Sequence, residues 1–236
     1  MPTLRRLQLL WPLVAALAAC SPPAQPPAPA PAPATAPTPE SPAEPTPGAA
    51  AVPPAPTVSA APADPERDAV LFTHWRAKHA PEVDAFEEFL VQEKVAQVVP
   101  TYQLLRSASM WKECHADPFE LPPATEWPRV RDLLVLLQEL RTRGVLADFE
   151  VVSAYRDPRL NRCAGGAKGS SHQRFAVDIA PLPRDRAERL CRFWHAEGKA
   201  WEMGVSRYPT GRIHIDRTGY RTWGASYRRA SSFCLD

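Results

Sequence analysis

Two short apolar stretches in the C-terminal half of the chain carry side chains of the types that bind metals. The first, SSHQRFAVDIAPL, contains His172 and Asp178, and the second, RIHIDRTGYRTWG, contains His214. Zinc hydrolases typically use three protein ligands and keep a fourth position for a water whose pKa the metal lowers. These three side chains supply such a set, so we expect one zinc site. The alternative is that Asp178 caps a strand end and His214 is a hydrogen-bonded, half-buried residue.

Strand periodicity places the candidate ligands on faces that can meet. Side chains of a strand alternate between its two faces. In RFAVDIA, Asp178 therefore lies opposite Val177 and Ile179, with a small alanine on either side of it on its own face. In RIHID the same alternation puts His214 and Asp216 together, opposite the two isoleucines. Polar groups of ligand type are thus expected on one face across two strands.

The surrounding elements predict an α+β fold, with a small antiparallel sheet and flanking helices. The clearest helix has Pro128 in its first turn and an apolar stripe that ends before Gly144. Other elements follow from β-branched content or helical periodicity. They are strands at 148–156, 174–180, 202–208 and 212–218, helices at 183–198 and within 65–98, and an irregular stretch at 100–128. Few long crossovers separate the strands, which favours antiparallel pairing.

The N-terminus resembles a lipoprotein export signal. Two arginines precede an apolar segment that is too short to span a bilayer comfortably, and residues 17–20 resemble a bacterial lipobox. We expect residues 1–19 to be a signal peptide and Cys20 to be the lipidated N-terminus; an ordinary secretory signal is the alternative. Ser21 stands where aspartate would favour inner-membrane retention. The expected location is therefore the outer membrane, facing the periplasm.

Composition divides the rest of the chain into a tether and a domain. Residues 20–64 are rich in proline and alanine and contain no aromatic residue, so they are expected to be disordered. Residues 65–236 have mixed apolar and charged composition and are expected to form one domain with its own core. Membrane contact is expected through the lipid anchor only. A net charge of +2 does not indicate a nucleic-acid partner.

Four cysteines remain once Cys20 is assigned to lipid. An even number in an oxidising compartment predicts two disulfides, for which three pairings are possible. We favour Cys114 with Cys163 and Cys191 with Cys234. A cysteine-rich zinc site is the weaker alternative, because none of the four stands in a C-x2-C pair.

Two segments of the chain carry a family resemblance. SAYRDPRLNRCAGGAKGSSHQRFAVDI resembles the core of the zinc D-Ala-D-Ala peptidase family, which shares its fold with the hedgehog signalling domain. SRYPTGRIHIDRTGYRTW is similar to the final segment of the murein endopeptidase branch, in which a Y-P, V-H-I-D, R-x-W pattern recurs. The two matches occur in the family's order and cover roughly residues 149–223.

The resemblance implies roles for individual residues. It implies zinc on the three candidate ligands and a role for Arg156 in orienting the substrate or stabilising the transition state. A guanidinium suits this role, because its planar fork matches a carboxylate or a developing oxyanion. The alternative for Arg156 is a surface arginine that ends a strand. Ser153 and Tyr155 are expected to support its loop or to pack in the core, and Ser171 is expected to contact the ligands.

The chain departs from the family pattern between the first two ligands. The family has six residues between this histidine and aspartate, with a glycine among them. Here five residues separate His172 from Asp178, and Phe175 stands near the position of the missing glycine. The sequence therefore raises the question of whether the shortened loop still brings the two ligands together.

A second departure concerns the general base. Several branches of the family have an acidic residue or histidine two or three residues before the last ligand, where this chain has Arg212 and Gly211. Asp216 is the best local candidate, as a base or as a hydrogen-bond partner of His214. The alternative is that Asp216 pairs with Arg212 or Arg217.

The resemblance implies a zinc-dependent peptidase that hydrolyses peptide bonds of peptidoglycan stem peptides or cross-links in the periplasm. Carboxypeptidase and endopeptidase activity, on D,D or L,D bonds, all remain open. The alternative is a catalytically inactive lipoprotein of the same fold that binds peptidoglycan or a partner protein. A purely structural secreted protein held by disulfides is a third reading, but it leaves the histidines and the aspartate unexplained.

Overall fold

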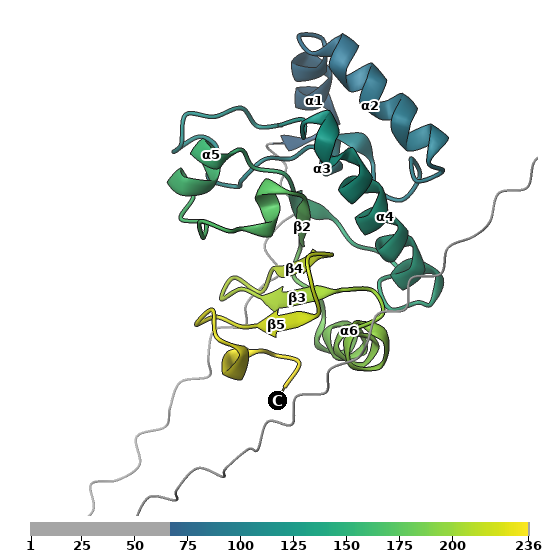
Figure 1. Cartoon of the computed structure of the whole chain (residues 1–236). Helices are drawn as coiled ribbons and strands as arrows, with labels where there is room; N and C mark the ends of the chain where they lie inside the picture. Colours follow the sequence, from purple (N-terminus) through teal and green to yellow (C-terminus); the bar gives the residue numbers. More distant parts are fainter. Residues whose placement is uncertain (1–66, 236) are drawn as a thin grey trace, which may run out of the picture. The chain divides into compact units, whose positions relative to one another are not determined.

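The computed structural model describes residues 67–235 (Figure 1). The expected signal peptide, the lipidated Cys20 and the Pro/Ala-rich tether fall outside these residues. Within the described part, no helix combines the length and hydropathy needed to cross a bilayer. The helices are α1 (Ala69–Arg76), α2 (Ala80–Gln92), α3 (Thr101–Leu104), α4 (Trp127–Thr142), α5 (Pro158–Cys163) and α6 (Arg184–Glu197).

Helix α4 forms where the sequence predicts the clearest helix. Pro128 lies in its first turn, where a missing backbone N–H costs nothing. The apolar stripe is fully buried, and the chain leaves the helix at Gly144, whose φ of 67° suits glycine. Helix α5 was not expected from the sequence. It begins because Asp157 accepts a hydrogen bond from the N–H of Leu160 at 2.6 Å, with proline at the start of the first turn.

The sheet has five strands in the order β1-β2-β4-β3-β5. Their bounds are β1 Val151–Ser153, β2 Ala176–Ile179, β3 Gly204–Arg207, β4 Ile213–Asp216 and β5 Arg221–Trp223. The α+β class, with a small sheet and flanking helices, is confirmed. The pairs β1–β2, β2–β4 and β3–β4 are antiparallel as expected, whereas β3 and β5 pair in parallel. After β4 the chain passes the end of β3, and β5 then pairs with the edge of β3 that faces away from β4. The sheet is therefore mixed.

One face of the sheet belongs to the hydrophobic core. Val177, Ile215 and Val205 pair across β2, β4 and β3, and all three are fully buried. Helix α6 lies beside β3 and β5 (Figure 1). Its Trp194 donates a hydrogen bond to the carbonyl of Met203 at 3.0 Å and stacks on Tyr220, which precedes β5. The core thus holds one face of the sheet rigidly and leaves the other face for polar groups.

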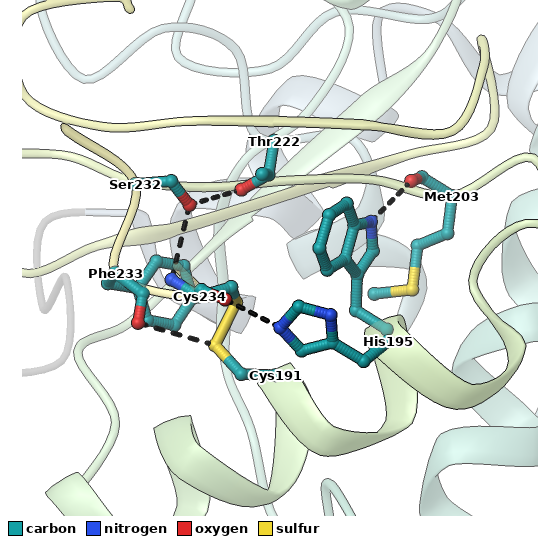
Figure 2. The surroundings of a disulfide bond; sticks show 8 residues. Cys191, His195, Met203, Thr222, Ser232, Phe233 and Cys234 are labelled. Carbon is teal, nitrogen blue, oxygen red and sulfur yellow. Dashed lines mark hydrogen bonds between the residues drawn. A yellow bond between two sulfur atoms is a disulfide. The ribbon is translucent and has the colours of Figure 1, made fainter. Parts of the chain in front are cut away.

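Two disulfides join segments that are far apart in the chain. They are Cys114–Cys163 and Cys191–Cys234, the pairing that we expected. Figure 2 shows the second, which ties the C-terminal segment to α6. There, His195 Nε2 lies 2.6 Å from the carbonyl oxygen of Cys234, and the hydroxyls of Ser232 and Thr222 contact each other. The C-terminal segment is thereby fixed to both α6 and β5.

Removing the C-terminal disulfide is expected to lower the free energy of unfolding. The cross-link closes a loop of 43 residues in sequence separation, and its loss, in the variant Cys191→Ser/Cys234→Ser, should cost about 2–4 kcal/mol. Urea unfolding under non-reducing conditions measures the change. The variant Cys114→Ser/Cys163→Ser is a matched comparison, because its separation of 49 residues predicts a similar loss. An unchanged midpoint in the first variant would show that the cross-link does not constrain the unfolded chain.

Candidate metal centre

A row of buried polar side chains crosses the face of the sheet opposite the hydrophobic core. Strand register pairs Ser153 with Asp178, Asp178 with His214, and His214 with Ser206. Paired residues share a face, so β1, β2, β4 and β3 each contribute to one row. Two of the three candidate ligands are direct cross-strand neighbours in this row. The alternation expected from RFAVDIA and RIHID therefore produces the arrangement that a shared site requires.

The structure brings all three candidate ligands together. One oxygen of Asp178, Oδ1, lies 3.1 Å from His172 Nε2 and 2.9 Å from His214 Nδ1. One ligand atom from each residue lies within 4.8 Å of the others, and all three side chains are buried. Among residues 67–235, no other group of histidine, cysteine and carboxylate side chains meets this spacing. Their convergence is the main requirement for a metal site.

The second nitrogen of each histidine is already engaged. His172 Nδ1 lies 2.6 Å from the carbonyl oxygen of Ala154 and must donate to it, which leaves Nε2 free to bind a metal. His214 Nε2 lies 2.8 Å from Asp216 Oδ2, which leaves Nδ1. Ser171 Oγ is 3.0 Å from the same Nε2. Zinc-binding histidines commonly donate their other N–H in this way, so two imidazoles and one carboxylate fit zinc.

The shortened loop between His172 and Asp178 closes without the glycine. Ser171–Gln173 form a short 3-10 turn, and the N–H of Phe175 bonds to the carbonyl of Ser171 at 2.8 Å. Phe175 then adopts a φ of 137°, in the region that glycine favours, while its ring is buried in the core. Such a conformation costs a non-glycine residue about 1–3 kcal/mol. Ring burial offsets this strain and lets five residues span the ligands.

Burial and charge keep His172 and Asp178 in the protonation states that metal binding needs, whereas Asp178 and Asp216 outweigh burial and raise the pKa of His214, which must lose a proton to bind a metal. Burial, with the nearby charge of Arg156, lowers the pKa of His172 to about 4. Burial alone would raise the pKa of Asp178, but the two histidines and Arg156 outweigh it and hold that pKa well below its usual range. His172 is thus neutral and Asp178 ionised at neutral pH. Both states favour coordination of a cation.

Arg156 is an inward-facing arginine. Its side chain is only 12% exposed, and Nη2 lies 2.8 Å from Asp178 Oδ2 and 2.9 Å from Ser153 Oγ. The surface alternative is therefore wrong. Its own backbone N–H bonds to the carbonyl of His172 at 3.1 Å. Ser153 supports Arg156 as expected, whereas Tyr155 packs in the hydrophobic core.

The family model described as Peptidase M15 matches residues 104–216. The match supports the M15 peptidase family. It includes all three candidate ligands and Arg156, and it begins well before the segment in which the sequence resemblance was seen. The α+β arrangement agrees with an M15 peptidase-like fold, and M15 peptidases typically depend on zinc. No curated protein and no solved structure matches the chain.

Asp216 lies behind the candidate metal centre and does not line the cavity above it. It is fully buried, with Oδ2 on His214, and Oδ1 accepts from the backbone N–H of Thr218 at 2.8 Å and from its hydroxyl at 2.7 Å. Its ionic partner is Arg221 and neither of the two arginines considered from the sequence. Because both oxygens are occupied, the expected role as general base does not fit. Asp216 instead orients His214.

A cavity of about 690 Å³ opens over the candidate metal centre. Its walls come from the Gly-rich loop at 164–170, the C-terminal segment, and the residues around Tyr208. The hydroxyl of Tyr208 lies 3.4 Å from His214 Nδ1, and burial raises the pKa of this phenol above its usual value. It therefore stays protonated and can donate a hydrogen bond. The sequence offered only a Y-P pattern for it, with no indication of its direction.

A partly buried carboxylate supports the loop that carries Arg156. Both oxygens of Glu120 accept the backbone N–H of Asp157, at 3.1 and 3.2 Å. Burial raises the pKa of Glu120 to about 7, although the hydrogen bond from Asp157 lowers it. Glu120 lies in the stretch that we expected to be irregular, 37 residues before its partner. Only the folded chain reveals this contact.

The free energy of unfolding should therefore depend on the ionisation of Glu120. Its pKa of about 7 in the folded state exceeds the ordinary value of 4.5, so the folded protein binds the extra proton between these values. The contribution of Glu120 to stability is greatest below pH 4.5, falls as the pH rises to about 7, and stays lower above it. The variant Glu120→Gln should lack this pH-dependent contribution. The difference in the free energy of unfolding between the wild-type protein and the variant should therefore change by about 1–2 kcal/mol between pH 4.5 and pH 8, allowing for the partial exposure of Glu120.

Urea unfolding between pH 4.5 and pH 8 measures this difference. The matched control is Glu82→Gln, which changes an exposed carboxylate. Glu82 and Glu120 both line a second pocket, separate from the cavity over the candidate metal centre. If Glu120→Gln and the wild-type protein show parallel pH profiles, then Glu120 does not carry the proton.

Proposed function

We propose that the protein is a zinc-dependent peptidase that hydrolyses peptide bonds of peptidoglycan stem peptides or cross-links. The observation that carries the proposal is the convergence of His172, Asp178 and His214 within 4.8 Å inside a match to the M15 peptidases. His172 Nε2, His214 Nδ1 and the Asp178 carboxylate would hold the metal. When bound, zinc supplies Lewis-acid polarisation of a carbonyl and lowers the pKa of a water.

Arg156 would position the substrate. Two of its nitrogens are held by Ser153 and Asp178, whereas Nη1 makes no hydrogen bond within residues 67–235. Because the guanidinium is rigid and planar, fixing one edge aims the remaining N–H groups at the cavity. Those groups can hold a substrate carboxylate or a carbonyl oxygen that gains negative charge. The protonated hydroxyl of Tyr208 can donate a further hydrogen bond to the same substrate.

We also propose that the protein works in the periplasm, attached to the outer membrane by a lipid on Cys20. The signal-like first 19 residues and the lipobox-like residues before Cys20 support this location. Two disulfides suit an oxidising compartment. The Pro/Ala-rich segment at 20–64 has the composition of an extended tether that would let the domain reach the cell wall.

A binding lipoprotein without catalysis is the second candidate. One observation favours it: among the described residues that line the cavity, Asp178 is the only carboxylate, and Arg156 occupies its second oxygen. A peptidase usually needs a group that accepts a proton from the attacking water. A protein of the same fold that holds peptidoglycan peptides without cleaving them would not need one.

Digestion of purified muropeptides by the full chain separates the two candidates. The products are followed by liquid chromatography and mass spectrometry, with zinc, with chelator, and with chelator followed by zinc. The peptidase proposal predicts cleavage that chelator abolishes and zinc restores. Binding to isolated cell wall that chelator does not affect, with no cleavage, would favour the binding protein. The identity of the released fragment would assign the bond that is cut.

A further inference from the structure

The side chain of Arg221 extends across strand β3 and forms an ion pair with Asp216, the carboxylate behind the candidate metal centre. Strand register places Arg221 of β5 beside Gly204 of β3, and Gly204 beside Asp216 of β4. Although β3 lies between them, Arg221 Nη1 is 2.9 Å from Asp216 Oδ1 and Nη2 is 2.7 Å from Oδ2. Two parallel N–H···O bonds of this kind fix both the position and the plane of a carboxylate.

Gly204 creates the space that this ion pair occupies. A Cβ at this position would lie 2.7 and 2.8 Å from the oxygens of Asp216 and 2.9 Å from Arg221 Nη1. These distances are shorter than any carbon atom tolerates beside fixed groups. The glycine is therefore required by the side chains that pass over it, whereas its φ places no such demand on it. Gly204 in the middle strand, Asp216 on one side of it and Arg221 on the other therefore form one unit.

The ion pair acts on a candidate zinc ligand. Asp216 Oδ2, which Arg221 holds, also lies 2.8 Å from His214 Nε2, and Thr218 binds the other oxygen. Asp216 is fully buried, so its orientation cannot relax into solvent. An imidazole whose Nε2–H donates to a fixed carboxylate presents Nδ1 in one direction. His214 Nδ1 is the atom that lies beside Asp178.

We propose that Arg221, acting through Asp216 across the gap at Gly204, is a positioning residue that holds His214 in the tautomer and orientation needed for zinc. This inference rests on the zinc site of the proposed function. The edge strand that carries Arg221 is itself held in place. Thr222 contacts Ser232, and the disulfide ties the end of this segment to α6 (Figure 2).

Zinc affinity of the full chain, measured by competition with a chromophoric chelator, tests the inference. Arg221→Leu should bind zinc about 10–100-fold more weakly than the unaltered protein. Arg221→Lys should recover part of the loss, because it restores the charge but not the paired bonds. Gly204→Ala should resemble Arg221→Leu. The matched control is Arg217→Leu. In the described structure Arg217 contacts the backbone carbonyls of Trp201 and Asp132 and the ring of Trp201, and it forms no ion pair with Asp216, so this variant should keep the original affinity.

Cobalt supplies a second readout that a general loss of stability would not reproduce. The visible absorption of the cobalt-loaded protein reports ligand geometry and should change in Arg221→Lys, which keeps a cation over Asp216. An Arg221→Leu variant that remains folded, with unchanged zinc affinity and an unchanged cobalt spectrum in both variants, would overturn the inference. Failure of the unaltered protein to bind zinc would instead overturn the proposed function, so the two outcomes are distinct.

Discussion

Replacing Asp178 with asparagine is expected to weaken zinc binding by on the order of a hundredfold or more. Asparagine keeps the size of the side chain but removes the negative charge that faces both histidines, through Oδ1, and Arg156, through Oδ2. The centre would then hold two neutral imidazoles beside an uncompensated guanidinium, which repels a cation. Peptidase activity should fall with the metal content.

Competition titration with a chelator and metal analysis after gel filtration measure the effect of Asp178→Asn. The control is Asp185→Asn, which changes an exposed carboxylate on α6 that pairs with Arg189. Circular dichroism establishes that both variants fold. Retention of one tightly bound zinc by Asp178→Asn would show that Asp178 is not a ligand.

Replacing Arg156 with alanine should lower kcat/KM by about 10²–10³-fold while leaving one zinc per chain. This is the usual effect of losing one donor to a developing oxyanion. Zinc should remain because Arg156 contacts Asp178 through Oδ2, while the two histidines meet Oδ1. Lysine is expected to rescue little activity, because a single ammonium cannot hold Ser153, Asp178 and the substrate together.

Kinetics on a purified muropeptide, with zinc content measured on the same samples, tests Arg156. Arg159→Ala is the matched control, since Arg159 lies three residues further on, on α5, and contacts only the carbonyl of His115 in the described structure. An unchanged kcat/KM in Arg156→Ala would show that Arg156 takes no part in the reaction. Loss of zinc from Arg156→Ala would show instead that Arg156 supports the metal centre.

Local sequence patterns predicted the parts of the site that lie within single strands. The two-residue period is a local property, so it placed Asp178 and His214 on the polar faces of their strands before their pairing was known. Helix α4 is likewise defined by its own proline, stripe and terminal glycine. The observed pairing of β2 with β4 keeps their apolar faces on the same side of the sheet, because a slip by one residue would turn one of them to the polar side.

The parts that escaped prediction depend on contacts between distant segments. Strand β5 has three residues, too few for a periodic signal, and it exists because it pairs with β3. Arg221 became the partner of Asp216 only through this pairing, across Gly204. Likewise, the positive φ of Phe175 reflects the ring's place in the core, which residue counting between the ligands could not reveal.

The central claim is that His172, Asp178 and His214 form one zinc site. Crystals of the full chain, loaded with one equivalent of zinc, test it most directly through anomalous X-ray scattering on both sides of the zinc edge. We predict a single strong peak at about 2.0–2.2 Å from His172 Nε2, His214 Nδ1 and an oxygen of Asp178. A peak at any other cluster of side chains, or no peak at this position under saturating zinc, would contradict the account.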